Sequence, residues 1–307
     1  MPDTQRQAPN LVPILHASAY VAPLPAGHRF PMNKYHYLIE QLRGAGLATS
    51  ANEITPRPAP RAWLDLAHDA DYVSAVLEQR VAPDIERRIG FAVTQRVALR
   101  SQLSCAGTLM AARLALESGI ALNSAGGSHH AHADFGAGFC VFNDVAVAAR
   151  VLLEEGEVSS ILVVDLDVHQ GDGTARIFAD EPRCTTFSMH CAVNFPVRKA
   201  ESDIDIGLPV KTGDAAYLKT LADTLPTLIA RTQPDLVFYN AGVDPHENDR
   251  LGKLSLTDAG LKARDAYVIN ICKARQIPLA VVMGGGYGTD LPAIARRHRF
   301  VFEAAAA

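Results

Sequence analysis

The sequence lacks the features that mark disulfide-stabilised, membrane-spanning and nucleic-acid-binding proteins. Its five cysteines are odd in number and scattered without a Cys-x-x-Cys spacing, so we expect neither a disulfide framework nor a thiolate zinc site, but a reduced, cytoplasmic chain. No apolar run reaches the length of a membrane span, and residues 1–7 lack the apolar core of a signal peptide. The formal net charge of −4 gives no reason to expect nucleic acid or an anionic membrane as a partner.

Short apolar runs do alternate regularly with longer helical patterns along the 307 residues. The expected strands are Leu11–Leu15, Ile120–Asn123, Ile161–Asp165, Thr185–Met189, Leu236–Asn240 and Leu279–Met283, and the expected helices are Val93–Ser118, Val141–Glu154, Ala215–Arg231 and Thr257–Ala274. Strands that are apolar throughout and separated by helices are typical of a parallel sheet covered on both faces. The sequence therefore predicts one α/β domain at residues 11–303, with mobile ends at residues 1–10 and 304–307.

The most informative segment is Asp165-Leu-Asp-Val-His-Gln-Gly-Asp-Gly173, which follows the apolar run Ile161–Val164. An Asp-x-His pair at the end of a strand, here Asp167 and His169, points both side chains to one face, where they can bind a metal ion. The alternative is a charged loop in which Asp172 caps the next helix.

Polar segments also follow the other strands, at Ser124–His130, Ser188–His190, Ala241–Asp244 and Gly284–Gly288. Because the carboxyl ends of parallel strands meet at one edge of a sheet, we expect these segments to converge on a common site. Asp244 is then the third metal ligand, although an Asx turn before Pro245 would also explain it. Mixed oxygen and nitrogen ligands suit zinc, and also iron(II), cobalt or manganese.

The adjacent histidines His129 and His130 are the second strong feature. Beside a metal-activated water, one imidazole can take a proton and return it to a leaving amine. Each imidazole needs a carboxylate to fix its tautomer, and we assign Asp165 to His129 and Asp172 to His130. A structural role is the alternative, because His132 shows that histidine is common in this segment.

Two aromatic side chains complete the pattern. Tyr287, in the glycine-rich segment Gly284–Gly288, can donate its hydroxyl to a developing oxyanion. The alternative is that the three glycines only allow tight packing. Phe139 follows Gly138 in a loop near the histidines, where it is either an exposed aromatic of the site or a core phenylalanine.

Together these residues resemble the zinc-dependent histone deacetylase family, which shares its fold with arginase. The matching motifs span roughly residues 10 to 300, in the family's order: Gly126-Gly-Ser-His129-His130, Gly138-Phe-Cys-Val-Phe-Asn-Asp144, Asp165–Gly173, Asn240-Ala-Gly-Val-Asp244 and Gly284-Gly-Gly-Tyr287. Arg88-Ile-Gly90 and Ser202–Pro209 look most like the class IV branch and its bacterial relatives. The resemblance implies a single-domain, three-layer α/β/α fold with a central, mostly parallel eight-stranded sheet.

The resemblance also implies residue roles. One zinc ion is expected on Asp167, His169 and Asp244, with Tyr287 polarising the acyl carbonyl, His130 as the main proton shuttle and His129 acting electrostatically. The channel for the acyl-lysine would run between Gly138-Phe139 and, less securely, Phe195. A structural potassium ion would use backbone oxygens of Asp167, His169 and Met189, together with Asp165 and Ser188.

The chain departs from its relatives at two places. Gly171 stands where arginase-type relatives carry a carboxylate for a second metal, which argues for a single metal and against a guanidino hydrolase. The acid that holds the substrate backbone in many relatives cannot be placed, and both Asp84 and Glu86 are candidates.

The sequence therefore predicts a zinc-dependent amidohydrolase that removes acetyl or other acyl groups from lysine side chains in proteins. The alternatives are a deacylase of small acetylated amines such as polyamines, and an acyl-lysine binding module that has lost catalysis. The sequence leaves the acyl chain length, the natural substrate and the oligomeric state open.

Overall fold

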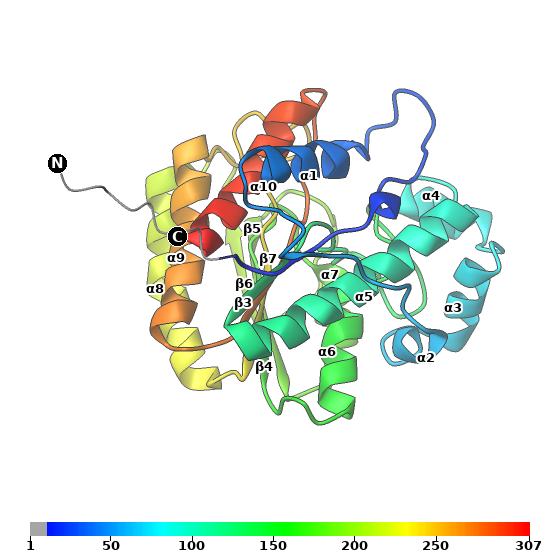
Figure 1. The fold of residues 1–307 in the computed structure, drawn as a ribbon, viewed down its shortest axis with the longest axis horizontal. Helices are drawn as coiled ribbons and strands as arrows, with labels where there is room; N and C mark the ends of the chain where they lie inside the picture. Colours follow the sequence, from blue (N-terminus) through cyan, green and yellow to red (C-terminus); the bar gives the residue numbers. More distant parts are fainter. Residues whose placement is uncertain (1–10) are drawn as a thin grey trace.

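A computed structural model describes residues 11–307, so the expected mobile segment at residues 1–10 lies outside the described part. A sheet lies at the centre of the fold, surrounded by helices (Figure 1). It has eight strands in the order β2-β1-β3-β8-β7-β4-β5-β6, and every pairing of neighbouring strands in the described chain is parallel. The strands are β1 (Ile14–Leu15), β2 (Glu53–Ile54), β3 (Ile120–Asn123), β4 (Ile161–Asp165), β5 (Cys184–Cys191), β6 (Ile204–Leu208), β7 (Leu236–Asn240) and β8 (Leu279–Val282).

Helices cover both faces of this sheet, as expected. The helices are α1 (Lys34–Gly44), α2 (Arg61–Leu64), α3 (Ala70–Leu77), α4 (Pro83–Ile89), α5 (Gln95–Ser118), α6 (Asp144–Glu154), α7 (Asp172–Ile177), α8 (Asp214–Thr232), α9 (Asp258–Ala274) and α10 (Leu291–Ala306). Side chains of α5 and α6 form one core with one face of the sheet, and those of α1, α8, α9 and α10 form a second core with the other face. None of the helices in residues 11–307 is long and apolar enough to cross a membrane.

The central strands read as unbroken apolar runs because both of their faces are buried. In β4, Ile161 and Val163 join the core under α5 and α6, whereas Leu162 and Val164 join the core under α8 and α9. The edge strand β6 differs, since its side chains alternate between partly buried and exposed. That alternation, and the brevity of β2, explain why neither strand was predicted.

Two sequence-based boundaries are wrong. The strand expected at Thr185–Met189 runs from Cys184 to Cys191, so His190 lies inside β5 and not after its end. The expected tail at residues 304–307 belongs largely to α10, which continues to Ala306 and buries Ala305 to 3 % exposure. The amphipathic face of α10 packs on α1 and α9, which keeps these alanines ordered.

The strand order explains how distant motifs meet. The strands β3, β8, β7 and β4 are consecutive neighbours, and the carboxyl end of each leads into one of the polar segments. The register of β4 sets Asp165 beside Asn240 of β7 and Ser188 of β5. Convergence on one edge, expected from the alternation of strands and helices, is confirmed for these segments.

Asp144, the first residue of α6, fixes the loop that carries the two histidines. Its buried carboxylate accepts hydrogen bonds from the Thr108 hydroxyl (2.6 Å) and from the backbone N–H groups of Gly127 (3.2 Å) and Ser128 (2.8 Å). The preceding Asn143 caps α6 by accepting from the N–H of Ala146 (3.0 Å). The start of α6 therefore also anchors the segment leading to His129.

We expect Asp144→Ala to lower the free energy of unfolding by about 3 kcal/mol, because it leaves two buried donors and one partly buried donor without their acceptor. Urea denaturation measures the change. The control is Asp223→Ala, which breaks only the exposed pair with Lys219 and should cost below about 1 kcal/mol. Equal losses in the two variants would contradict this account.

Candidate active site

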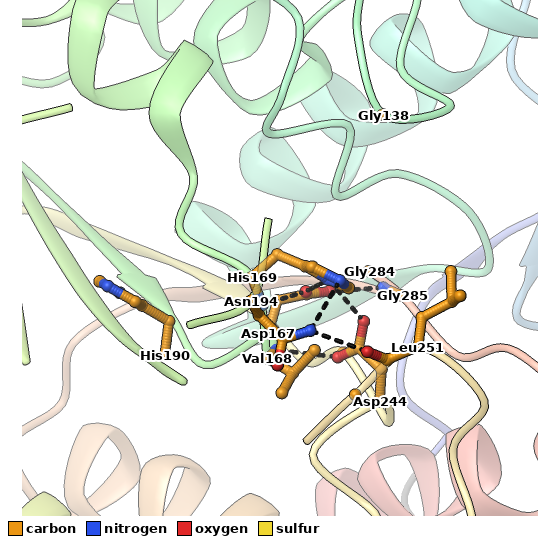
Figure 2. Close-up of polar contacts among 12 residues, drawn as sticks. Gly138, Asp167, Val168, His169, His190, Asn194, Asp244, Leu251, Gly284 and Gly285 are labelled. Carbon is orange, nitrogen blue, oxygen red and sulfur yellow. Dashed lines mark hydrogen bonds and ion pairs between the residues drawn. The ribbon is translucent and has the colours of Figure 1, made fainter. Parts of the chain in front are cut away.

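Asp167, His169 and Asp244 come together at the carboxyl edge of the sheet (Figure 2). The Nδ1 atom of His169 lies 3.0 Å from Oδ1 of Asp167 and 3.1 Å from Oδ2 of Asp244, and all three side chains are buried. One ligand atom from each residue lies within 4.8 Å of the others. The three ligands expected from sequence are therefore close enough to bind one ion.

Backbone N–H groups hold both carboxylates in place. Asp244 accepts from Val168 (2.8 Å), and Asp167 accepts from His169 (3.0 Å) and Gly285 (2.6 Å). A side chain at Gly285 would contact the Asp244 carboxylate and would lie 2.8 Å from that of Asp167. Position 285 therefore requires glycine, because any larger residue would collide with the two carboxylates.

The electrostatics of this cluster fit a cation. Burial, followed by the negative charge of Asp167, raises the pKa of Asp244 to about 7. The Asp167 carboxyl is buried too, yet His129 and His169 hold its pKa well below the usual value. Burial opposes protonation of His169, but the two carboxylates raise its pKa to about 10. Two buried carboxylates with an imidazole nitrogen between them form a donor set suited to zinc or a similar divalent ion.

Each histidine of the pair is bonded to the carboxylate assigned from sequence. Nδ1 of His129 donates to Oδ2 of Asp165, and Nδ1 of His130 donates to Oδ1 of Asp172, both at 2.6 Å. The two imidazole rings are 4.1 Å apart. Because Nδ1 is engaged in both residues, Nε2 is the atom available to a substrate or to water.

The surroundings separate the two histidines in pKa. Burial disfavours the charge on His129, but Asp165 and Asp167 outweigh it and raise the pKa to about 9. Burial and the neighbouring charge of His129 lower the pKa of His130 to about 4. At neutral pH this arrangement favours a protonated His129 beside a neutral His130 that can accept a proton.

Asp172 serves more than one partner. Its second oxygen lies 3.2 Å from Nε2 of His132, a residue that sequence reasoning treated only as background. Its pKa is held well below the usual range by both histidines, although burial opposes this. Asp172 is the first residue of α7, and the N-cap is Gly171, so the capping alternative for Asp172 is wrong.

Sequence reasoning missed two buried groups that support the site. Asn240, the last residue of β7, donates from Nδ2 to Asp165 (3.0 Å). Lys34, which is 1 % exposed, donates from Nζ to the carbonyl of Gly284 (3.0 Å) and lies 5.7 Å from the ring centre of Tyr287. Asn240 stands inside a quoted motif and could have been found, whereas no local signal marks Lys34.

Gly171 has a structural reason of its own. A side chain there would lie 2.5 Å from Oδ2 of Asp165 and 3.2 Å from Cβ of His129, so it would displace the bond between them. The glycine that argued for a single metal is also the residue that leaves room for the Asp165–His129 pair.

Tyr287, in the segment after β8, lies beside the expected metal ligand His169. Its ring centre lies 6.0 Å from that of His169, and its N–H donates to Asp249 (2.6 Å). Burial and the charge of Asp244 raise the pKa of the phenol well above its usual value, so the hydroxyl keeps its proton and can donate it in a hydrogen bond.

A pocket of about 350 Å³ leads from the surface to His130, His169 and Tyr287. Its lining includes the three residues expected to form the channel, Gly138, Phe139 and Phe195. Gly138 lies against the His130 imidazole, since a Cβ there would be 2.5 Å from the ring. The Phe139 ring stacks on Phe91 (6.2 Å), and the half-exposed Phe195 ring meets His130 edge to face (4.8 Å).

Neither expected acid lines this pocket. The carboxylate of Glu86 instead accepts from the N–H of Val93 (2.7 Å), and Asp84 lies in the first turn of α4. The lining does contain four cations that sequence reasoning missed, namely Arg29, Arg87, Arg88 and Lys253, and no carboxylate among the described residues.

The expected potassium ligands lie close together in the fold. Asp165 and Ser188 are register partners on β4 and β5, and Met189 follows Ser188. The N–H of Cys191 donates to the carbonyl of Val168 (2.9 Å), which brings the segment after β4 alongside the end of β5. Potassium binding by these residues stays a prediction.

A carboxylate–imidazole cluster flanked by two imidazole–carboxylate pairs in a pocket is typical of a metal-dependent hydrolase. The family model described as the histone deacetylase domain matches residues 28–304. An uncharacterised protein of Picosynechococcus is 46 % identical over 95 % of this chain and 98 % of its own length. Histone deacetylase 2 of Arabidopsis thaliana is 30 % identical over 85 % of this chain and 70 % of its own length.

Two further relatives agree. The acetoin utilization protein AcuC of Staphylococcus aureus is 28 % identical, over 84 % of this chain and 72 % of its own length. The crystal structure of the HDA15 HD domain superposes with a TM-score of 0.79 at 20 % identity, covering 96 % of this chain and 89 % of the other, which shows the fold. The chain belongs to the histone deacetylase family, as its motifs predicted, and is a deacetylase-type hydrolase acting on amide bonds.

We expect Gly285→Ala to reduce the amount of metal that co-purifies with the protein, because the added Cβ collides with the Asp167 and Asp244 carboxylates. Elemental analysis of the purified variant measures the loss. Gly44→Ala is the control, since a Cβ at that exposed helical position meets no atom within 4 Å. Unchanged metal content in Gly285→Ala would show that the two carboxylates are not the ligands.

Proposed function

We propose that the chain is a zinc-dependent lysine deacylase that hydrolyses the amide between an acyl group and the side-chain amine of lysine in proteins. The observation that carries the proposal is the cluster of Asp167, His169 and Asp244 at the base of a pocket that also presents two imidazoles and a phenol. A zinc ion held there would supply Lewis-acid activation of water and of the acyl carbonyl.

The chain's own residues account for the remaining chemistry. His130 removes a proton from the attacking water through Nε2 and later returns it to the leaving lysine amine, while Asp172 holds its tautomer. Tyr287 donates its hydroxyl to the developing oxyanion. His129, bonded to Asp165, adds positive charge beside the reacting centre.

The aromatic lining of the pocket supports a substrate side chain made of methylene groups. Phe139 and Phe195 line the approach, so an acylated lysine can enter with its methylene groups against aromatic rings.

We also propose that a potassium ion held near Asp165 and Ser188 stabilises the end of β4.

Small acetylated polyamines are the rival substrates. They retain free ammonium groups, and a pocket lined by four cations and no described carboxylate repels them. Turnover of an acetyl-lysine peptide and of an acetylated polyamine by the same zinc-loaded sample separates the two. The remaining rival, a module that only binds acyl-lysine, would require a lost ligand or catalytic group, and each expected group is present.

Tyr287→Phe should lower turnover by about 10²–10³-fold while zinc content stays unchanged, because it removes one donor to the oxyanion and no metal ligand. Activity on an acetyl-lysine peptide, measured together with zinc content, checks this. Tyr37→Phe, a change of the same kind on an exposed face of α1, serves as the control. Near-normal turnover of Tyr287→Phe would remove the tyrosine from the mechanism.

Asp172→Asn should lower turnover and move the acid limb of the pH–rate profile to lower pH. The negative charge of Asp172 raises the pKa of His130, so its loss lets that pKa fall further and weakens the base. Asp180→Asn, an exposed change just after the same helix, is the control. A profile with its acid limb in the original place would refute the pairing of Asp172 with His130 as a functional one.

A further inference from the structure

The mouth of the pocket carries charge of one sign. Arg29, Arg87, Arg88 and Lys253 line it, all four are exposed, and none of them makes an ion pair with another residue in the range 11–307. The chain as a whole has a net charge of −4, so this concentration of cations opposes the overall balance. An unneutralised cluster at the entrance of a pocket acts on whatever charged group approaches it.

Local structure explains only part of the cluster. Arg87 and Arg88 lie in the last turn of α4, where cations are favoured by the helix dipole whether or not a ligand is present. Arg29 and Lys253 have no such reason, because they come from loops far away in the sequence. Three separate segments thus bring cations to one opening.

These segments are tied to the channel walls. The N–H of Gly138 donates to the carbonyl of Arg88 (3.0 Å), and the N–H of Lys253 donates to the side chain of Asn194 (3.1 Å) beside Phe195. His28, which precedes Arg29, donates from Nε2 to the carbonyl of Gly90 (2.9 Å) at the end of α4. The backbone of each cation is therefore fixed relative to the channel.

The positive charge at the pocket mouth attracts or repels the residues beside the target lysine, and it does not act on the uncharged acyl-lysine itself. Acylation removes the charge of the target, so a cationic mouth does not hinder entry of the acyl-lysine. Neighbouring residues of an extended peptide lie ~3.5 Å apart, and charges act over ~10 Å in dilute salt, so about three residues on each side are affected. The freed lysine is an ammonium ion, which the same cations help to expel.

We propose that the four cations select acyl-lysines flanked by acidic residues and discriminate against those flanked by lysine or arginine. This inference rests on the proposed deacylase function and names its substrate class. An enzyme adapted to basic protein tails would need a different pocket mouth, because these four cations repel the lysine and arginine side chains of such tails.

Three acetyl-lysine peptides test the inference, identical except that the two residues on each side of the acetyl-lysine are all glutamate, all glutamine or all lysine. With zinc-loaded protein we expect kcat/KM to fall in that order, by roughly tenfold between the extremes, since each exposed pair contributes modestly. The ratio should shrink as sodium chloride is raised from about 0.05 M to about 0.5 M. Equal rates at low salt, or the reverse order, would overturn the inference and leave the deacylase function standing.

The double variant Arg87→Glu with Lys253→Glu should reduce or reverse the ratio between the glutamate and lysine peptides. The control is Arg231→Glu, which makes the same change of charge at an exposed position near the end of α8. Helix α8 leads into the amino end of β7, away from the carboxyl ends of the strands where the pocket lies. It should keep the ratio of the unaltered protein, and an equal shift in both variants would overturn the assignment to the mouth. Failure to hydrolyse any of the three peptides would instead overturn the proposed function, and this inference with it.

Discussion

The site depends on two carboxylates, Asp167 and Asp244, that face one imidazole in the protein interior. Like charges buried at such short range repel, so the arrangement requires compensating positive charge or a shared proton, and other groups must hold each carboxylate in place. Backbone N–H donors from the segments after β4 and β8 supply that support, and Gly285 leaves the space that the carboxylates require. The parallel sheet makes this possible because it delivers all of these segments to one edge.

The same edge gives two adjacent histidines different surroundings. His129 faces Asp165 at the end of β4, whereas His130 faces Asp172 at the start of α7. Asp165 and Asp167 raise the pKa of His129, whereas burial and the charge of His129 lower the pKa of His130 despite Asp172, so one imidazole favours the charged form and its neighbour the neutral form. The mouth of the pocket is built separately, from α4 and two loops outside the sheet, so that the reacting centre and the entrance draw on different parts of the chain.

Much of the site could be predicted because its signals are local. The Asp-x-His pair directly follows an apolar strand, and the double histidine stands in a glycine-rich segment, so strand position and side-chain chemistry identify them together. The carboxylate partners of the two histidines were predicted on the assumption that each imidazole needs one carboxylate to fix its tautomer. The hydrogen bonds of His129 to Asp165 and of His130 to Asp172 confirm both pairs. The central strands were equally predictable, since burial on both faces leaves an unbroken apolar run.

The sequence by itself determined the central strands, the candidate metal-binding residues and the two histidine pairs, because a short local pattern of residue types marks each of them. Tertiary structure alone decided the support of Gly284 by Lys34, the second partner of Asp172 and the cationic mouth. These features join residues that are far apart in the sequence and carry no local pattern. Each depends on which side chains lie next to each other in space, and only the packing of helices and loops around the sheet determines those contacts.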